Sequence, residues 1–211
     1  MANDLAQMSA RIADELARSD LTNQIALAIN DAILFYNNER FAFNESRDIT
    51  FVTAPAQEFY GVADNPAIPT MQSFDYIILY LGGIPWPVKR RTPEEVELLN
   101  NNGLVSGQPY NFAWYNKQIR LGPVPDSVFN MRIAGRINFA APASSSEQNN
   151  PWMTDVEKLI RARAKYEIAL NVIEDDDLAQ RMAAQVSEAF DQFKGAANRL
   201  TGTGMIQPTQ F

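Results

Sequence analysis

Near the middle of the chain, residues 106–126 read SGQPYNFAWYNKQIRLGPVPD. Two short runs typical of strands, Tyr110–Tyr115 and Gln118–Leu121, flank the pair Asn116-Lys117. Two-residue connections of this kind join the strands of β-hairpins. The glycine and prolines that follow end the second run, since proline cannot donate to a sheet. The stretch therefore predicts a β-hairpin at the centre of the chain.

The beginning of the chain is predicted to be helical, because its apolar residues recur every three or four positions. A first helix is expected over about Asp4–Arg18. Thr22 has a side chain suited to an N-cap, so a second helix is expected from there to about Phe41. The short link between them predicts an antiparallel helical hairpin.

The end of the chain shows the same helical spacing. Thr154-Asp-Val-Glu157 matches a capping box and predicts a long helix to about Ile173. The acidic run Asp175–Asp177 interrupts the pattern, and a last helix is expected over about Leu178–Leu200. Glycines then separate this helix from a short tail.

The middle of the chain is rich in strand-forming residues bounded by turn signals. A capping box with proline at the first helical position predicts one short helix within it, Pro93–Asn100. The expected strands besides the hairpin are Ile49–Val52, Glu58–Val62, Phe74–Tyr80, Trp86–Arg91 and Val128–Phe139.

Helices at both ends and strands between them indicate an α+β fold. We expect a four-helix bundle built from the two terminal hairpins, with a β-rich insertion that forms a sandwich or small barrel. The expected divisions are a helical hairpin at 1–47, the β-rich insertion at 48–140, a second hairpin at 141–201 and an extended tail at 202–211.

Composition narrows the possible functions. The 211 residues carry a net charge of -7 and include neither cysteine nor histidine. Thiolate catalysis and cysteine-based zinc sites are excluded, and the commonest general base and metal ligand is missing. The acidic balance argues against general nucleic-acid binding but suits a channel past which DNA slides. We expect no enzyme, no cofactor and no metal.

Several charged or aromatic groups have simpler explanations than chemistry. Glu174 with Asp175–Asp177 resembles a divalent-metal cluster, but capping of the last helix explains it better. For the basic residues we expect solvation, with a local charge balance at positions 89–91 and the alternative of ion pairs with a neighbouring subunit at positions 158–165. For the aromatic residues we expect packing or interface contacts. The basic residues are Lys89, Arg90, Arg91, Lys158, Arg161, Arg163 and Lys165, and the aromatic ones are Tyr110, Phe112, Trp114 and Tyr115.

The tail carries apolar residues but is too short to have a core of its own. It is either disordered or docked on a partner. The residues expected to bind such a partner are Met205, Ile206, Gln207 and Phe211.

Three parts of the chain resemble the head–tail adaptor (connector) proteins of tailed bacteriophages. They are the opening helical hairpin up to Glu39-Arg-Phe-Ala-Phe-Asn-Glu45, the stretch 106–126 with its Ile119-Arg-Leu-Gly-Pro-Val-Pro-Asp126, and Pro151-Trp-Met153 before a long helix. The resemblance implies a homo-oligomeric ring, twelve-fold by analogy, beneath the portal protein. It also implies that double-stranded DNA passes through the lumen without specific binding, that the tail reaches the portal, and that a further tail component binds below.

We therefore expect a virion protein of the head–tail junction, assembled in the host cytoplasm, with no signal peptide and no membrane contact. A small-molecule or peptide binding module that uses the β-rich insertion is the alternative. An enzyme is the least favoured hypothesis, since it would need acids such as Glu94 and Asp126 together in a cleft.

Overall fold

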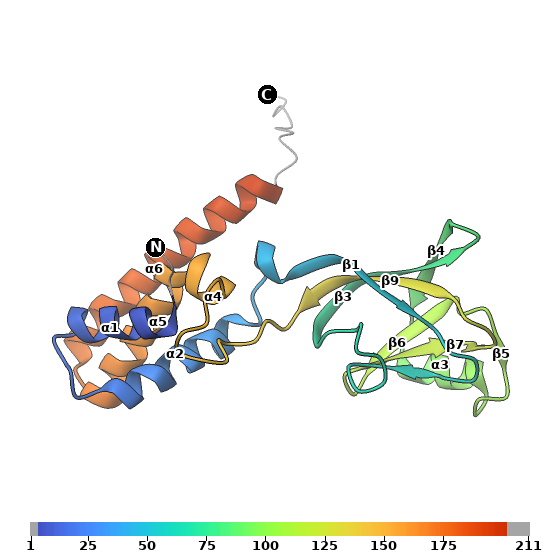
Figure 1. Ribbon diagram of the computed structural model, residues 1–211, viewed down its shortest axis with the longest axis horizontal. Coiled ribbons are helices and arrows are strands. Elements are labelled where there is room, and N and C mark those ends of the chain that lie inside the picture. Colours follow the sequence, from blue (N-terminus) through green and yellow to red (C-terminus); the bar gives the residue numbers. More distant parts are fainter. Residues whose placement is uncertain (1–3, 202–211) are drawn as a thin grey trace, which may run out of the picture. The chain divides into compact units, whose positions relative to one another are not determined.

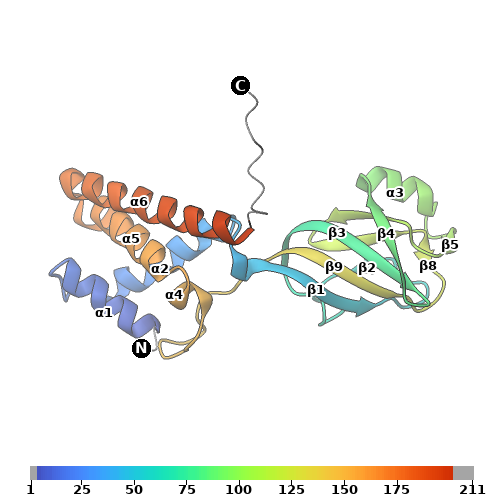
Figure 2. The ribbon, with the colours of Figure 1, turned by 90° about the horizontal axis from the view of Figure 1, so that it is seen from above.

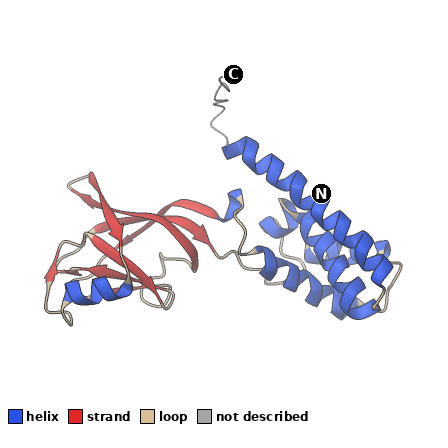
Figure 3. Cartoon of the chain, turned by 180° about the vertical axis from the view of Figure 1, so that it is seen from behind, coloured by secondary structure: helices blue, strands red, loops and turns tan. Residues whose placement is uncertain are grey.

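The structure is a computed structural model that describes the backbone of residues 4–201 and the side chains of residues 4–194. The chain divides into two compact units, one formed by Met1–Glu39 with Ala140–Phe211 and one by Arg40–Phe139. The first is helical and the second is a curled β-sheet with one covering helix (Figures 1 and 3). The class is therefore mixed α+β, as the sequence indicates.

The helical unit is organised around its central helix, α5, which contacts α1, α2 and α6 (Figure 2). Its interior consists mainly of aliphatic residues and methionines, together with the fully buried Trp152. The helices are α1 (Leu5–Glu15), α2 (Thr22–Tyr36), the short α4 (Pro151–Thr154), α5 (Glu157–Ile168), a π-helical turn (Ala169–Ile173) and α6 (Asp176–Thr201).

Two predicted N-caps are wrong, and burial explains both. Thr22 is the first residue of α2, and the N-cap position is taken by Leu21, whose side chain is buried. Thr154 ends α4 instead of starting the long helix, because Trp152 and Met153 are buried in the core and hold that short helix in place. The cap of α4 is Asn150, which accepts a hydrogen bond from the Trp152 amide at 3.1 Å.

The acidic run does cap the last helix as predicted. Asp175 Oδ1 accepts a hydrogen bond from the Leu178 amide at 2.9 Å. Before it, Glu174 adopts a left-handed conformation with φ of 56° and ends the π-helical turn. The two helices at the start of the chain are shorter than expected. Helix α1 ends at Glu15 and α2 ends at Tyr36.

The β unit contains a seven-stranded sheet in the order β1-β9-β3-β4-β6-β7-β2. All neighbouring strands are antiparallel except β4 and β6. The strands are β1 (Glu45–Val52), β2 (Phe59–Tyr60), β3 (Met71–Leu81), β4 (Ile84–Arg90), β6 (Asn111–Tyr115), β7 (Gln118–Gly122) and β9 (Asn130–Ile137), with a separate pair, β5 (Ser106–Gly107) and β8 (Val124–Pro125). A 3₁₀ turn, Ala42–Asn44, precedes β1, which begins four residues earlier than predicted.

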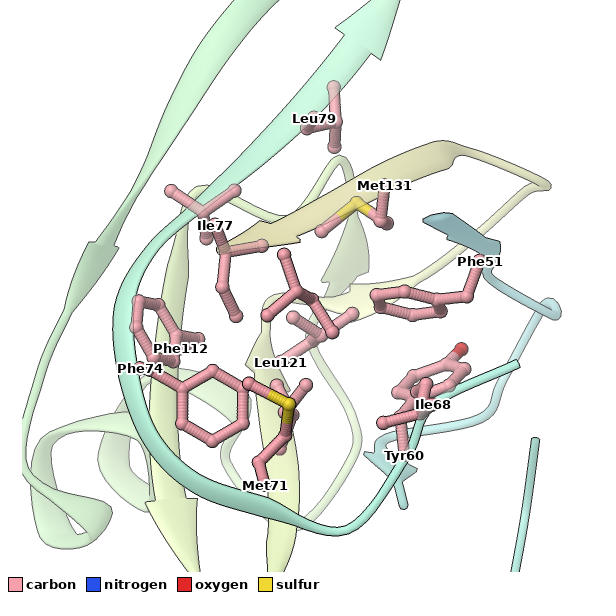
Figure 4. Close-up of a cluster of buried hydrophobic side chains, with 13 residues drawn as sticks. Phe51, Tyr60, Ile68, Met71, Phe74, Ile77, Leu79, Phe112, Leu121 and Met131 are labelled. Atoms are coloured by element: carbon pink, nitrogen blue, oxygen red, sulfur yellow. The ribbon is translucent and has the colours of Figure 1, made fainter. Parts of the chain in front are cut away.

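Side chains bring the two edges of this sheet together, so that it forms a half-barrel. Phe51 on β1 and Tyr60 on β2 lie with ring centroids 5.4 Å apart, and the Tyr60 hydroxyl accepts a hydrogen bond from the Ala54 amide at 3.0 Å. Figure 4 shows both rings in the cluster that fills the interior. A strand was expected at Glu58–Val62, but β2 contains only Phe59 and Tyr60. Backbone pairing stops there, and the Tyr60 side chain completes the closure of the sheet.

The central hairpin and the short helix are confirmed. Tyr115 pairs with Gln118 across a turn in which Asn116 and Lys117 have φ of 49° and 60°, as a type I′ turn requires. Helix α3 (Pro93–Asn100) has the predicted capping box and covers β6 and β7. Strand β6 is consequently buried on both faces near its start.

Candidate assembly surfaces

An aromatic groove lies between α2, α5 and α6 of the helical unit. It has a volume of about 380 Å³. We call it the aromatic groove and define it by Phe35, Tyr36, Glu39, Arg163, Tyr166, Ala183, Val186, Ser187 and Phe190.

Arg163 is the fixed positive charge of the aromatic groove. Its guanidinium carbon lies 4.1 Å from the centroid of the Phe35 ring and 5.1 Å from that of Tyr166, within cation–π range. Glu167 pairs with it at 2.5 Å, while its buried Nε has no hydrogen-bond partner among the described residues. Burial raises the pKa of Tyr36 above its ordinary value, and its hydroxyl is neutral at physiological pH with or without this shift. The groove therefore suits an apolar or aromatic segment with no charge of its own.

A second apolar groove separates α1 from α2. It has a volume of about 410 Å³, and small side chains leave the helix backbones accessible to a neighbouring element. Its lining is Leu5, Ala6, Ser9, Ala10, Ala13, Thr22, Ile25, Ala26 and Ser145.

Helix α2 also has an exposed apolar ridge on another face. Leu27 and Leu34 are exposed by 64% and 65%, and Phe35 by 53%. Seven residues separate the two leucines, which is two turns of helix, so they share one face. Ile25 and Ile29, by contrast, are fully buried. Leu27, Leu34 and Phe35 therefore give α2 hydrophobic surface that its own unit does not cover, next to exposed polar residues such as Asp31.

The hairpin of β3 and β4 carries a fourth apolar surface, which lies in the β unit. Ile84 and Trp86 share a strand face with the buried Val88 but are exposed by 60% and 51%. Pro85 and Pro87 lie on the opposite face and lack an N–H, so the free edge of β4 cannot donate there to another strand. Contact at this hairpin is therefore expected through side chains rather than by strand addition.

The basic residues of α5 pair within the chain. Glu15 of α1 binds Arg161, and it also binds Lys165 at 2.7 Å. Glu157 accepts from Arg11 of α1 and from Arg161, each at 3.2 Å. These residues were expected to be solvated or to pair with a neighbouring subunit. Instead Arg161 and Lys165 fasten α1 to α5, Arg163 pairs with Glu167 within α5, and Lys158 donates to Gln192 of α6 at 2.8 Å.

In the β unit, Arg120 forms a partly buried ion pair with Glu58 at 2.5 Å and a second with Glu97. The hydrogen bond from Arg120 lowers the pKa of Glu97 below its ordinary value. Arg91 pairs with Glu95 at 3.6 Å, as the local charge balance predicts. Arg120 was not singled out from the sequence, because its partners lie 62 and 23 positions away.

The aromatic group of the central hairpin divides into two parts. Phe112 is buried, and Trp114 packs against Phe74 with centroids 4.5 Å apart, so packing is confirmed for both. Tyr110 and Tyr115 are exposed by 50% and 64%. Only these two remain available to a partner.

The candidates for chemistry are not brought together. Within the described residues no group of three or more acidic side chains is placed to hold a metal ion. Glu94 and Asp126 are both exposed, and Asp126 accepts from the hydroxyl of its neighbour Ser127. Over residues 4–201, none of the helices has the length and apolar character needed to cross a membrane. The proposed tail contacts Met205, Ile206, Gln207 and Phe211 lie outside the described residues.

Comparison with known families identifies the class of protein. The chain matches the model of the SU10 adaptor protein family over residues 3–208. It therefore belongs to that family, and the resemblance to the head–tail adaptors of tailed bacteriophages is confirmed. No curated protein matches the chain.

Proposed function

We propose that this protein is a structural adaptor that forms a homo-oligomeric ring beneath the phage portal and joins the head to the tail. Its assembly, rather than a reaction, is its function. In this proposal residues 1–47 and 141–201 act as one four-helix bundle that packs against neighbouring copies. Residues 48–140 face a tail component, and residues 202–211 reach the portal.

The observation that carries the proposal is that two of the apolar surfaces of the helical unit are unlike one another. One is the small-residue groove between α1 and α2, and the other is the ridge of Leu27 and Leu34. Head-to-tail contacts between identical subunits need two unlike surfaces, and they close into a ring when the rotation per subunit divides a full turn. By analogy with the family, we propose that the ring has twelve subunits.

The net charge of -7 supports a lumen that DNA passes without being held. Phosphate binding depends on clustered lysine and arginine, and most cations of α5 are already paired with carboxylates. The β unit favours the adaptor over a small-molecule binding module, because its interior is filled by buried side chains such as Phe112 and Leu121.

The direct test mixes the purified protein with the portal of its own particle and examines the product by electron microscopy. We expect a ring coaxial with the portal. Deletion of residues 205–211 should weaken attachment while circular dichroism shows the helices unchanged, whereas Leu98→Ser, an 81%-exposed site in the β unit, should bind as the parent does. Failure of the full chain to bind that portal under any assembly condition would overturn the proposal.

A further inference from the structure

Strands β1, β9, β3 and β4 present one face to the interior of the half-barrel and the other to its outside. Their inward side chains belong to the buried cluster and include Phe51, Leu79, Val88 and Met131. Helix α3 covers β6 and β7 instead (Figure 1). We propose that the outward face of these four strands binds a segment of a partner protein that carries a carboxylate between apolar side chains. The inference rests on the proposed function and deepens it, since it names the chemistry by which residues 48–140 hold a tail component.

The register of the sheet arranges the outward side chains in two rows across the four strands. One row is Thr50, Arg132, Ile78 and Pro87, and the next is Val52, Asn130, Tyr80 and Pro85. We call these eight residues the outer sheet face. None of them is buried, and Val52 is exposed by 50%. A groove of about 410 Å³ includes Val52, Asn130 and Tyr80 in its lining, so the second row is hollowed.

Arg132 is the charged residue of the outer sheet face, and the chain leaves it without an acid. Its Nε is buried and has no hydrogen-bond partner, and no carboxylate of the described residues pairs with its guanidinium. Arg120, on β7 of the same unit, is paired with both Glu58 and Glu97. A cation that is partly withdrawn from water loses hydration, and only an opposite charge with good geometry restores what it loses. A carboxylate from outside the chain would supply that charge to Arg132.

The position of the Arg132 guanidinium suits such a ligand. Its central carbon lies 5.5 Å from the centroid of the Tyr80 ring, within cation–π range. A guanidinium that stacks on a ring keeps the N–H donors of its edge free, and this planar fork matches the two oxygens of a carboxylate.

The surroundings of Arg132 favour a protein over a nucleic acid. Val52, Ile78, Pro85 and Pro87 offer only apolar side chains, so the residues that flank the carboxylate should be apolar too. A nucleic-acid strand would bring a series of phosphates to a surface with one arginine, whereas phosphate binding depends on clustered cations.

The dimensions of the outer sheet face set the length of the segment. Neighbouring strands lie about 4.8 Å apart, so four strands span about 14 Å. An extended chain covers about 3.3 Å per residue, and about four residues therefore cross the face. Arg132 lies on β9, the second strand of the four, which places the carboxylate at an inner position of the segment. A suitable probe is the peptide acetyl-Leu-Asp-Leu-Phe-amide.

The test titrates the isotopically labelled full-length chain with this peptide and follows it by NMR. At peptide concentrations up to about 10 mM, which detect millimolar binding, the Arg132 Nε–H and the Ile78 methyl signals should shift. The matched peptide with Asn in place of Asp should bind about tenfold more weakly, because it offers a neutral acceptor to a charged donor.

Two arginine variants assign this preference to one side chain. Arg132→Gln should reduce the difference between the two peptides to about twofold or less. Arg90→Gln removes the same charge from an exposed position two residues from the inward Val88, and it should keep the full difference. Arg132→Gln should also melt no lower than the parent chain, because it removes a cation that no carboxylate of the described residues compensates.

The contrary outcomes are distinct. Equal affinity of the parent chain for the two peptides, or no shift at Arg132, would overturn the proposal. A lower melting temperature of Arg132→Gln with unchanged peptide preference would assign Arg132 to the fold alone. Shifts at Arg132 with a short DNA duplex but not with the peptide would show a phosphate site and would equally overturn it. The titration contains no portal, so its failure leaves the portal test unaffected, and failure of the portal test leaves the peptide result standing.

Discussion

Replacing Gly135 by alanine should strongly destabilise the β unit. Gly135 is buried in β9, where it pairs with Phe74 of β3 beside a shift in strand register. A Cβ built at this position would lie 2.1 Å from the carbonyl oxygen of Ser73 and 3.0 Å from Met71 Cε. The first of these atoms is backbone, so it cannot turn aside as a flexible side chain would.

The magnitude follows from the displacement that alanine requires. To reach an ordinary contact of about 3.4 Å, the Ser73 carbonyl and the Gly135 backbone must separate by about 1.3 Å, between two hydrogen-bonded strands. Overpacking of this kind costs about 1–3 kcal/mol and sometimes more, and we expect about 3 kcal/mol because backbone must move. For a unit of this size that corresponds to a fall in Tm of about 12–24 °C.

The assay must separate the two units, because their transitions need not coincide. Thermal unfolding by calorimetry gives the total effect. Hydrogen exchange read by mass spectrometry then assigns it: peptides from β3 and β9 should lose protection in Gly135→Ala, while peptides from α5 should not. Gly107→Ala is the matched control, because no atom lies within 4 Å of its added Cβ and its φ is not positive.

A stability of Gly135→Ala within about 0.5 kcal/mol of Gly107→Ala would mean that the strands relax freely at the register shift. Loss of protection in α5 alone would mean that the substitution acts outside the β unit.

Three further predictions concern charges and the hairpin turn. Arg120→Ala should lower the free energy of unfolding by about 3 kcal/mol, because the largely buried Glu58 carboxylate loses its cation. Arg91→Ala removes a half-exposed ion pair and should cost no more than about 1 kcal/mol. Equal costs for the two variants in urea titration would contradict this. Lys117→Gly should stabilise by about 0.5–1 kcal/mol in the same titration, since Lys117 holds a φ of 60°, and a loss of stability would count against the type I′ turn. The hydrogen bond from Arg18 lowers the pKa of Asp20 from 3.8 to about 2. The stabilising effect of this hydrogen bond is therefore complete above about pH 4 and is lost as the pH falls through about 2. An NMR titration of Asp20 should show a midpoint near 2 that returns toward 3.8 in Arg18→Gln, and a midpoint near 4 in the parent chain would refute the prediction.

The features that the sequence predicts well are those with short-range causes. The hairpin follows from the residues that tolerate positive φ between two strand-like runs, and α3 from a capping box within four residues. The cap at Asp175 is of the same kind. In each case the hydrogen bond that fixes the element joins residues close in the chain, so the local pattern contains the information.

The features that it misses depend on long-range contacts. The short helix α4 and the wrong cap at Thr154 follow from the burial of Trp152, which depends on the whole helical core. The ion pair between Glu15 and Arg161 spans 146 positions. The closure of the sheet by Phe51 and Tyr60 likewise leaves no periodic signal in either strand.

The aromatic groove was missed for a related reason. Its residues come from three helices, and none stands out as a motif. Two local signals did exist: Arg163 and Tyr166 lie three positions apart on one helix, the spacing at which side chains meet. Helix α2 also carries Leu27, Leu34 and Phe35 outside the face that it buries in the core, which indicates apolar surface available to a partner.

The distribution of charge and apolar surface in the helical unit supports assembly through packing rather than through salt bridges. Charged side chains of α1 and α5 are used within the subunit, where Glu15 and Glu157 hold three cations. The α1–α2 groove, the ridge of α2 and the aromatic groove remain uncovered among the described residues. Charges that are already paired contribute little new energy at an interface, whereas each buried apolar side chain contributes about 1.5–3 kcal/mol. Contacts between copies of this unit should therefore be held by apolar surface, and should weaken little as salt concentration rises.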